Sequence, residues 1–306
     1  MNLLRYSAFA LPNGGGNPAG VVLDSSEMQS EQMLALAAAL GYSETAFLRQ
    51  IDEREYSIRY FSPQSEVDFC GHATVAAAVA LAEDRYGAGE LRLHANVGEI
   101  AVSVVPDAAG LRATLTTVPP DTAPLDALPE LLRVLGWSED DLETSLPCGL
   151  AFAGIWHPIV WAASRERLAE LDYDFAALEA LMHREGWGTV SLLFRETPGL
   201  IHSRNAFPIG GVVEDPATGA AAGALGGFLR AYGLLPEDGA FTVLQGADMG
   251  QPCRLDVDAS GEGGVRVSGT ARRDDAVQPN SASVSASERA NMARSTSRST
   301  SDNRVR

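Results

Sequence analysis

Two short polar stretches of this chain carry side chains that could do chemistry, and each stands directly before one copy of a repeated segment. Cys70-Gly71-His72 precedes residues 73–81, Glu214-Asp215-Pro216 precedes residues 217–225, and seven of the nine positions of the two segments are identical. Thiols, imidazoles and carboxylates are the groups that proteins use as acids, bases and nucleophiles. Unlike polar residues at equivalent positions of a repeated frame are typical of one site shared between two halves.

The repeated segments predict the elements that position these residues. Residues 73–82 are small and apolar almost throughout, and a helix without a polar stripe is surrounded by protein on every side. A recurrence at about half the foldable length indicates an internal duplication. The sequence therefore predicts an α+β fold of two similar lobes, each a curled, mostly antiparallel sheet around a central apolar helix.

The start of each enclosed helix is a candidate anion site. The first amides of a helix have no partner within it, and its N-terminus is the positive end of the helix dipole. Solvent cannot reach these amides freely when protein surrounds the helix. We therefore expect both helix starts to attract an anion unless local caps consume the amides.

Glu44 is the unusual residue of a strand predicted at residues 42–48. Glutamate is disfavoured in strands and is seldom buried without a partner. A glutamate between Ser43 and an apolar run either faces solvent or is placed for chemistry. Residue type alone favours the solvent face.

The composition argues against several classes of protein. The chain has 306 residues, is 45% hydrophobic and 21% charged, and has a formal net charge of −17. Nucleic acids and anionic membrane surfaces both need a positive footprint, so we expect neither as a partner. Arg5 interrupts the apolar run at the N-terminus, which predicts neither a signal peptide nor a membrane span. We expect a cytoplasmic protein.

Cysteine and histidine usage predicts neither disulfides nor a metal site. The three cysteines are widely spaced and form no CxxC pair, which indicates a reducing compartment. The five histidines show no HxxxH or similar ligand spacing. The cysteines are Cys70, Cys148 and Cys253, and the histidines are His72, His94, His157, His183 and His202.

The chain divides into two predicted lobes and a tail. Residues 118–124 are rich in proline and lack periodicity, which is typical of a linker, so we place the lobes at 1–117 and 118–272. Residues 273–306 are rich in serine, threonine and arginine without an apolar pattern. Such a segment cannot bury enough surface to offset the entropy of ordering, which predicts a disordered tail.

Four blocks of residues resemble the signature blocks of the PhzF-like family, which comprises the phenazine-biosynthesis isomerase and its relatives. The resemblance runs in the right order over roughly residues 3–271. The blocks are Gly16-Asn17-Pro18-Ala19-Gly20-Val21, Ser43-Glu44-Thr45-Ala46-Phe47, Val67-Asp68-Phe69-Cys70-Gly71-His72-Ala73-Thr74 and Glu214-Asp215-Pro216-Ala217-Thr218-Gly219.

The resemblance implies the diaminopimelate-epimerase-like fold, with the site in the cleft between two lobes. It also implies a cofactor-free isomerase, usually a homodimer, that moves a proton within a small carboxylate-bearing metabolite. Glu44 would carry the proton, His72 and Asp215 would assist it, and no metal would take part. The expected substrate-binding residues are Asn17, Gly71, Gly219 and Ala220, the glycines and Ala220 through backbone amides.

The proposed chemistry makes two demands on the site. A base that removes and returns a carbon-bound proton needs a pKa nearer neutrality than that of a solvated glutamate, and a water-poor site raises the pKa in that direction. Two helix N-termini would stabilise the charge of an enolate-like state. The sequence departs from the family at Ala220, where the block commonly has serine, so a hydroxyl is missing there.

Two other functions remain open from the sequence. One is a thiol-dependent racemase or epimerase that uses Cys70, although Glu214-Asp215-Pro216 offers no second cysteine. The other is a non-catalytic binding protein that kept the fold.

Overall fold

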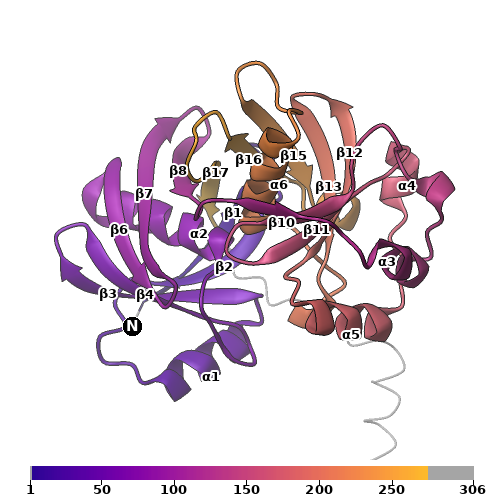
Figure 1. Ribbon diagram of the computed structural model, residues 1–306. Helices are drawn as coiled ribbons and strands as arrows, with labels where there is room; N and C mark the ends of the chain where they lie inside the picture. Colours follow the sequence, from indigo (N-terminus) through magenta and orange to yellow (C-terminus); the bar gives the residue numbers. More distant parts are fainter. Residues whose placement is uncertain (1, 275–306) are drawn as a thin grey trace, which may run out of the picture. The chain divides into compact units, whose positions relative to one another are not determined.

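The computed structural model describes residues 2–274, and residues 1–273 form one compact unit. The tail predicted to be disordered lies outside the described residues from position 275 onward. Within the described part of the chain, no helix has both the length and the apolar character needed to cross a membrane. Helices and strands are mixed and most strand pairs are antiparallel, as the sequence predicts (Figure 1).

The first half of the chain contains two α-helices and eight strands. Its elements are β1 (Leu3–Ala8), β2 (Asn17–Val22), α1 (Ser30–Leu40), β3 (Glu44–Asp52), β4 (Glu55–Phe61), β5 (Glu66–Val67), α2 (Gly71–Leu81), the π-helical turn η1 (Ala82–Tyr86), β6 (Gly89–Ala95), β7 (Gly98–Asp107) and β8 (Gly110–Thr116).

The second half begins with β9, which forms inside the predicted linker. Its elements are β9 (Asp121–Ala123), α3 (Leu128–Leu135), η2 (Glu139–Asp141), β10 (Gly149–Phe152), β11 (Trp156–Trp161), α4 (Arg165–Ala169), α5 (Phe175–Glu185), β12 (Val190–Thr197), β13 (Leu200–Ala206), η3 (Pro208–Gly210), β14 (Glu214–Asp215), α6 (Gly219–Ala231), β15 (Ala240–Gln245), η4 (Ala247–Met249), β16 (Cys253–Asp258) and β17 (Arg266–Arg273).

The strand pairing of the first half recurs in the second with every strand number raised by nine. In the first half, β1–β2, β3–β4, β4–β5, β6–β7 and β7–β8 are antiparallel, and β2–β3 and β4–β6 are parallel. In the second half, β10–β11, β12–β13, β13–β14, β15–β16 and β16–β17 are antiparallel, and β11–β12 and β13–β15 are parallel. These seven pairings therefore occur in both halves of the described chain.

Helix α2 is buried from His72 to its end and contacts strands on every side, including β1, β2, β3, β7, β8 and β17. Its alanines and valines explain this placement, because small side chains let the strands approach the helix axis. Thr74 is the polar exception, and its hydroxyl is bonded within the protein to the Cys70 carbonyl at 2.6 Å.

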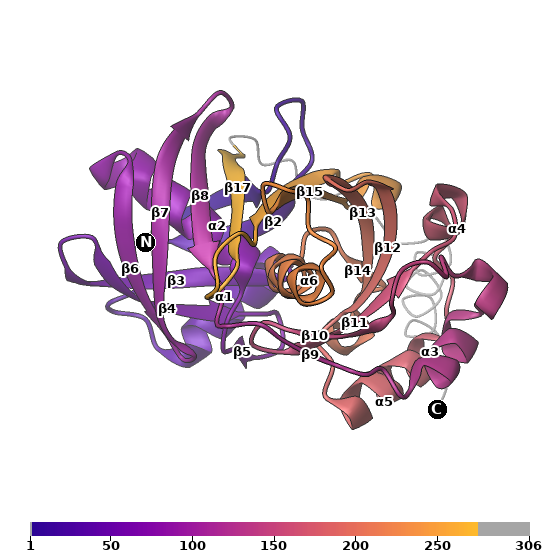
Figure 2. The same ribbon diagram turned by 45° about the horizontal axis from the view of Figure 1, so that its top comes forward.

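Helix α6 is enclosed in the same way, as the end-on view in Figure 2 shows. Three glycines of α6 allow this close contact. A Cβ on Gly223 would lie 2.4 Å from the Thr117 side chain, and one on Gly227 would lie 2.2 Å from that of Pro120. One on Gly226 would lie 2.8 Å from the Val265 side chain. The segment around the predicted linker therefore packs directly on α6.

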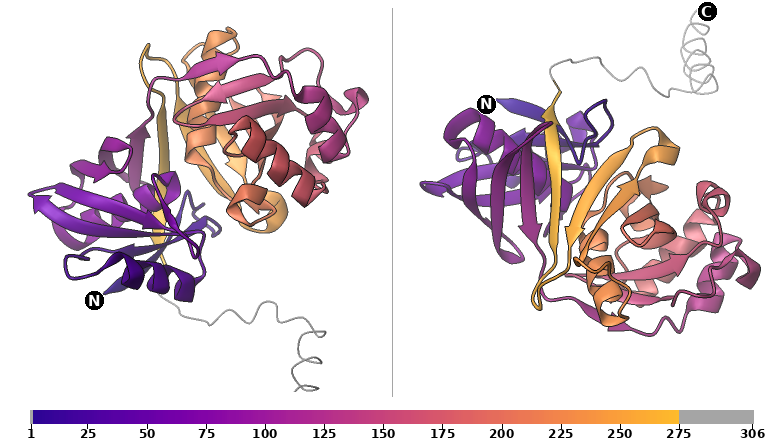
Figure 3. Two further views of the ribbon diagram at one scale, coloured as in Figure 1. Left: turned by 60° about the horizontal axis from the view of Figure 1, so that its bottom comes forward. Right: turned by 90° about the horizontal axis from the view of Figure 1, so that it is seen from above.

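Strand β17 joins the two halves of the sheet (Figure 3). It pairs with β16 of the second half and with β1 and β8 of the first. The last strand of the predicted C-terminal lobe thus completes the sheet around α2 as well as that around α6. The division at residue 117 stays a prediction.

Candidate active site

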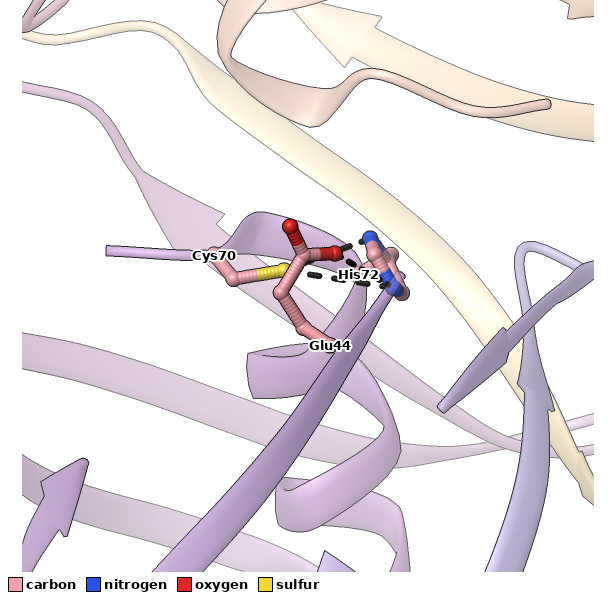
Figure 4. A group of neighbouring side chains, drawn as sticks. All are labelled: Glu44, Cys70 and His72. Carbon is pink, nitrogen blue, oxygen red and sulfur yellow. Dashed lines mark hydrogen bonds and ion pairs between the residues drawn. The ribbon is translucent and has the colours of Figure 1, made fainter. Parts of the chain in front are cut away.

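Glu44 is the first residue of β3, and its side chain is only 15% exposed. Its carboxylate points toward the ring of His72, with 3.5 Å between Oε2 and Nε2 (Figure 4). The solvent-facing placement that residue type favours is therefore wrong. Parallel pairing of β3 with β2 sets Glu44 beside Ala19, near the N-terminal ends of these two strands and close to the start of α2.

His72 lies in the first turn of α2 and is buried. Its Nε2 is 3.4 Å from the Ser43 hydroxyl, and its Nδ1 is 3.3 Å from the Cys70 sulfur. Glu44, Cys70 and His72 bring an oxygen, a sulfur and a nitrogen within 4.8 Å of one another, which is a donor set that zinc sites use. Ligand spacing in the sequence could not reveal this cluster, because Glu44 joins it through the fold.

Asp215 reaches the same place from the second half of the chain. Its carboxylate accepts hydrogen bonds from Asn17 Nδ2 at 2.8 Å and from Thr218 Oγ1 at 2.5 Å. Asn17 Nδ2 also donates a hydrogen bond to the Ala217 carbonyl oxygen at 3.2 Å. Asn17 therefore ties β2 to the segment that leads into α6, and its amide hydrogens are used inside the protein.

Two side chains to which the sequence assigned no role in the site, Gln245 and Arg204, hold this segment. Gln245 donates to the Asp215 carbonyl at 2.7 Å and accepts from the Thr218 amide at 3.2 Å. Arg204 forms a buried, two-pronged ion pair with Glu214, the neighbour of Asp215. A buried arginine needs such a partner, but which carboxylate it meets depends on the pairing of β13 with β14.

The starts of α2 and α6 meet beside these groups. A Cβ placed on Gly71 would lie 3.7 Å from the Cα of Gly219 and 4.0 Å from the Ala220 nitrogen. A Cβ at either glycine would meet the other backbone at an ordinary van der Waals distance. The first-turn amides of the two helices, which have no partner within their own helix, therefore lie close to each other and to Glu44, His72 and Asp215.

Burial shifts the acidity of all three groups. Desolvation raises the pKa of Glu44, and hydrogen bonds from Ser43 and Cys70 only partly oppose it. Desolvation, with a smaller contribution from the Glu44 charge, raises the pKa of Asp215 to about 6. Desolvation lowers the pKa of His72, which keeps its ring neutral near pH 7. The site thus holds two carboxyl groups that bind protons more tightly than they would in water.

Asp215→Asn should gain stability relative to the wild type as the pH rises from about 4 to about 6. In this range the folded wild type still binds a proton that the unfolded chain, with an aspartate pKa of 3.8, has released. The wild type therefore loses stability with rising pH, by up to about 3 kcal/mol, and the asparagine does not titrate. Urea unfolding of both proteins across this range measures the difference, and a constant difference would contradict the raised pKa.

The family model described as phenazine biosynthesis-like protein matches residues 6–274. The chain belongs to this family. Its relatives include an uncharacterised isomerase of Deinococcus radiodurans, 34% identical over 272 residues, with 85% of this chain and 88% of the relative covered. A trans-2,3-dihydro-3-hydroxyanthranilate isomerase of Pseudomonas fluorescens is 30% identical over 264 residues, with 85% and 91% covered. As a member of the phenazine biosynthesis-like family, the chain is an isomerase.

Solved structures agree with this membership. A predicted epimerase from Pseudomonas aeruginosa superimposes with a TM-score of 0.79 at 28% identity, over 91% of this chain and 99% of that one. A hydroxyproline epimerase from Agrobacterium vitis gives a TM-score of 0.59 at 14% identity, over 89% and 88%. The second likeness shows that racemase-like proteins outside the phenazine biosynthesis-like family share the fold.

Proposed function

We propose that this isomerase moves a proton from one carbon to another of a small carboxylate-bearing metabolite, with Glu44 as the acid and base. The observation that carries the proposal is the place of Glu44. Its carboxylate is largely buried, its pKa is raised, and it lies 3.5 Å from His72 at the first turn of α2. A base so placed can take a weakly acidic proton near neutral pH and then give it back.

In the first step, the Glu44 carboxylate takes a proton from a carbon of the substrate. The electron pair of the broken C–H bond moves toward the substrate carboxylate and forms an enolate-like state. In the second step, protonated Glu44 returns the proton to another carbon of the same π-system. Neutral His72 donates a hydrogen bond to a substrate oxygen, Asp215 assists the movement of the proton, and the steps need no cofactor.

The amides at the starts of α2 and α6 hold the substrate carboxylate in this proposal. They are fixed before the substrate arrives, so they stabilise developing negative charge without reorganising. Ala220 offers its backbone amide but no hydroxyl, which leaves the anchoring to backbone groups at this position. Asn17 acts indirectly, because it orients Asp215.

A thiol-dependent racemase is disfavoured by the surroundings of the cysteines. Burial and the charge of Glu44 raise the pKa of Cys70 well above its ordinary value. Cys253 lies near Asp215, but burial and the Asp215 charge raise its pKa to about 12. A thiolate is the form that abstracts protons, and both sites disfavour it.

We also propose that the two halves arose by internal duplication. The seven strand pairings that recur with a shift of nine support this origin, as do the similar segments 73–81, inside α2, and 217–225, which begins two residues before α6. After such a duplication, the residues at the starts of the two helices diverged. The start of α2 now supplies His72, and the segment before α6 supplies Asp215.

Proton exchange with deuterium oxide tests the proposed reaction. We expect the wild type to isomerise trans-2,3-dihydro-3-hydroxyanthranilate, or another small unsaturated carboxylic acid, and to place deuterium at the receiving carbon in the turnovers in which protonated Glu44 exchanges with solvent. Proton NMR follows both the new isomer and the loss of the signal. A chain that binds such acids, as a shift in melting temperature would show, but neither isomerises them nor exchanges their protons would contradict the proposal and favour a binding protein.

A further inference from the structure

A row of polar side chains leads away from Asp215 into the second half of the protein. Asp215 pairs with Asn205 on β13, and Asn205 pairs with Ser191 on β12. Directly paired residues point their side chains to the same face of a sheet, so the three side chains share one face. His157 on β11 belongs to this face too, because it lies two residues before Ile159, which pairs with Ser191.

This face is the one that covers α6. Ile159, Leu193 and Ile201 alternate with the polar residues along β11, β12 and β13, and they pack in one core with Leu225 and Phe228 of α6. The opposite face, with Val160 and Leu192, packs against α3 and α5 instead. The polar row therefore lies inside the sheet around α6, on the side of the catalytic groups.

Two side chains at the far end of the row have polar atoms without a partner. Ser191 Oγ and His157 Nε2 are buried, and neither has a hydrogen-bond partner among residues 2–274. The residues themselves are only 2% and 1% exposed. Asn205, which lies nearer to Asp215, has a hydrogen-bond partner, because Ser203 donates to Asn205 Oδ1 at 2.9 Å.

The bonding of His157 tells which kind of group its free nitrogen can bind. His157 Nδ1 lies 3.2 Å from the Thr189 amide nitrogen, 3.0 Å from the Thr189 hydroxyl and 3.3 Å from the Thr189 carbonyl oxygen. We assign Nδ1 as the acceptor of the ring, because a backbone amide can only donate and a hydroxyl can rotate to donate. Burial lowers the pKa of His157 to about 4, which keeps the ring neutral. The proton of a neutral imidazole then sits on Nε2, where it forms an unused donor. The matching partner is an oxygen acceptor.

Buried polar atoms are nearly always hydrogen-bonded in proteins, because an unpaired one has lost its water without compensation. Here two such atoms lie on adjacent strands, on one face, in a row with a catalytic carboxylate. The bond from the Thr189 amide explains a histidine at position 157, but neither that bond nor packing uses Nε2 or the Ser191 hydroxyl. Binding a polar group gives a reason.

We propose that Ser191 and His157 form a subsite for an oxygen-bearing group of the substrate, remote from its carboxylate. The proposal rests on the proposed function, since it takes the substrate to lie between the helix starts and the polar row. Ser191 lies two strand spacings, about 10 Å, from Asp215, measured across the strands β12, β13 and β14. The substrate class is a ring-sized carboxylic acid with a hydroxyl or carbonyl oxygen, which Nε2–H or the Ser191 hydroxyl binds.

A matched pair of probes tests the subsite. The probes are 2-amino-3-hydroxybenzoate and 2-aminobenzoate, aromatic acids that differ by one oxygen, titrated calorimetrically into the full chain. We expect the wild type to bind the hydroxylated acid about tenfold more tightly, and Ser191→Ala to reduce this ratio to nearly one. His157→Asn should do the same, because asparagine can keep an acceptor where Nδ1 was but has nothing in place of Nε2.

Ser25→Ala is the control, because Ser25 is a buried serine whose hydroxyl donates to the Leu48 carbonyl at 2.9 Å. It should lower the melting temperature and leave the ratio unchanged. Ser191→Ala should not lower the melting temperature, since its hydroxyl has no bond to lose. Equal binding of both acids to the wild type, binding of neither, or an unchanged ratio in both variants would overturn the subsite.

Deuterium exchange separates this proposal from the proposed function. A wild type that exchanges substrate protons but does not discriminate between the probes lacks the subsite and keeps the reaction. One that discriminates between the probes, and loses this in Ser191→Ala, but exchanges no protons, has the subsite and lacks the reaction.

Discussion

Replacing Glu44 with glutamine should lower turnover by about 10³-fold or more while the protein stays folded. General acid–base catalysis by one side chain contributes about 10²–10⁴ in rate, and the proposed reaction has no second base to compensate. Glutamine has the same shape and can still accept from Ser43, but its amide cannot carry the proton. Deuterium incorporation into the substrate, measured by proton NMR, gives the rate.

The stability and binding of this variant are part of the test. Glutamine avoids the burial of a charge, so the melting temperature should stay the same or rise slightly. Substrate affinity should change little, because the helix amides and not Glu44 hold the carboxylate. Glu90→Gln, on the exposed side of β6, is the matched control and should keep full activity. Exchange at the wild-type rate in Glu44→Gln would rule out Glu44 as the base.

Glu214→Ala should destabilise the protein by about 3–5 kcal/mol. The side chains of Arg204 and Glu214 are only 9% and 5% exposed, and Arg204 Nε lies 3.0 Å from Glu214 Oε2. Arg204 also donates to the Ala169 carbonyl at 2.5 Å, so the ion pair links β13 and β14 to the end of α4. Alanine would leave the arginine charge buried without its counterion. Urea unfolding measures the loss.

Two further variants separate burial from charge. Glu130→Ala removes the partner of Arg184 in an ion pair whose side chains are 54% and 39% exposed, and it should destabilise the protein far less than Glu214→Ala, because solvent screens the pair. The double variant Arg204→Met/Glu214→Leu should recover much of the loss, because apolar side chains of similar volume often replace a buried pair without penalty. Equal losses from Glu214→Ala and Glu130→Ala would show that burial adds nothing to this ion pair.

Sequence reasoning could predict the elements whose pattern is local. The small-residue segments that become α2 and α6 stand out because no polar stripe interrupts them, and the strand signals alternate clearly in β6, β7 and β8. Short strands could not be predicted, because they contain too few residues to show an alternating pattern. β5 and β14 have two residues each, and β9 has three residues inside a proline-rich stretch.

The candidate site shows the same difference between local patterns and tertiary contacts. The family motif blocks predicted Glu44, His72 and Asp215 as site residues, whereas the residue type of Glu44 alone favoured the solvent face. No pattern in the sequence pairs Asn17 with Asp215, which lie 198 positions apart, or Gln245 with the Asp215 carbonyl. Pairs like these depend on strand order, which a periodicity does not contain.

By itself, the sequence predicted the two repeated segments, the two apolar helices and the polar residues at their starts, because neighbouring residues carry each of these patterns. Only the tertiary structure decided which groups meet. It set Glu44 against His72, brought Gly71 to within contact of Gly219, and left His157 and Ser191 buried without partners. The physical reason is that acidity, anion binding and hydrogen-bond satisfaction depend on burial and on partners, and the fold alone supplies both.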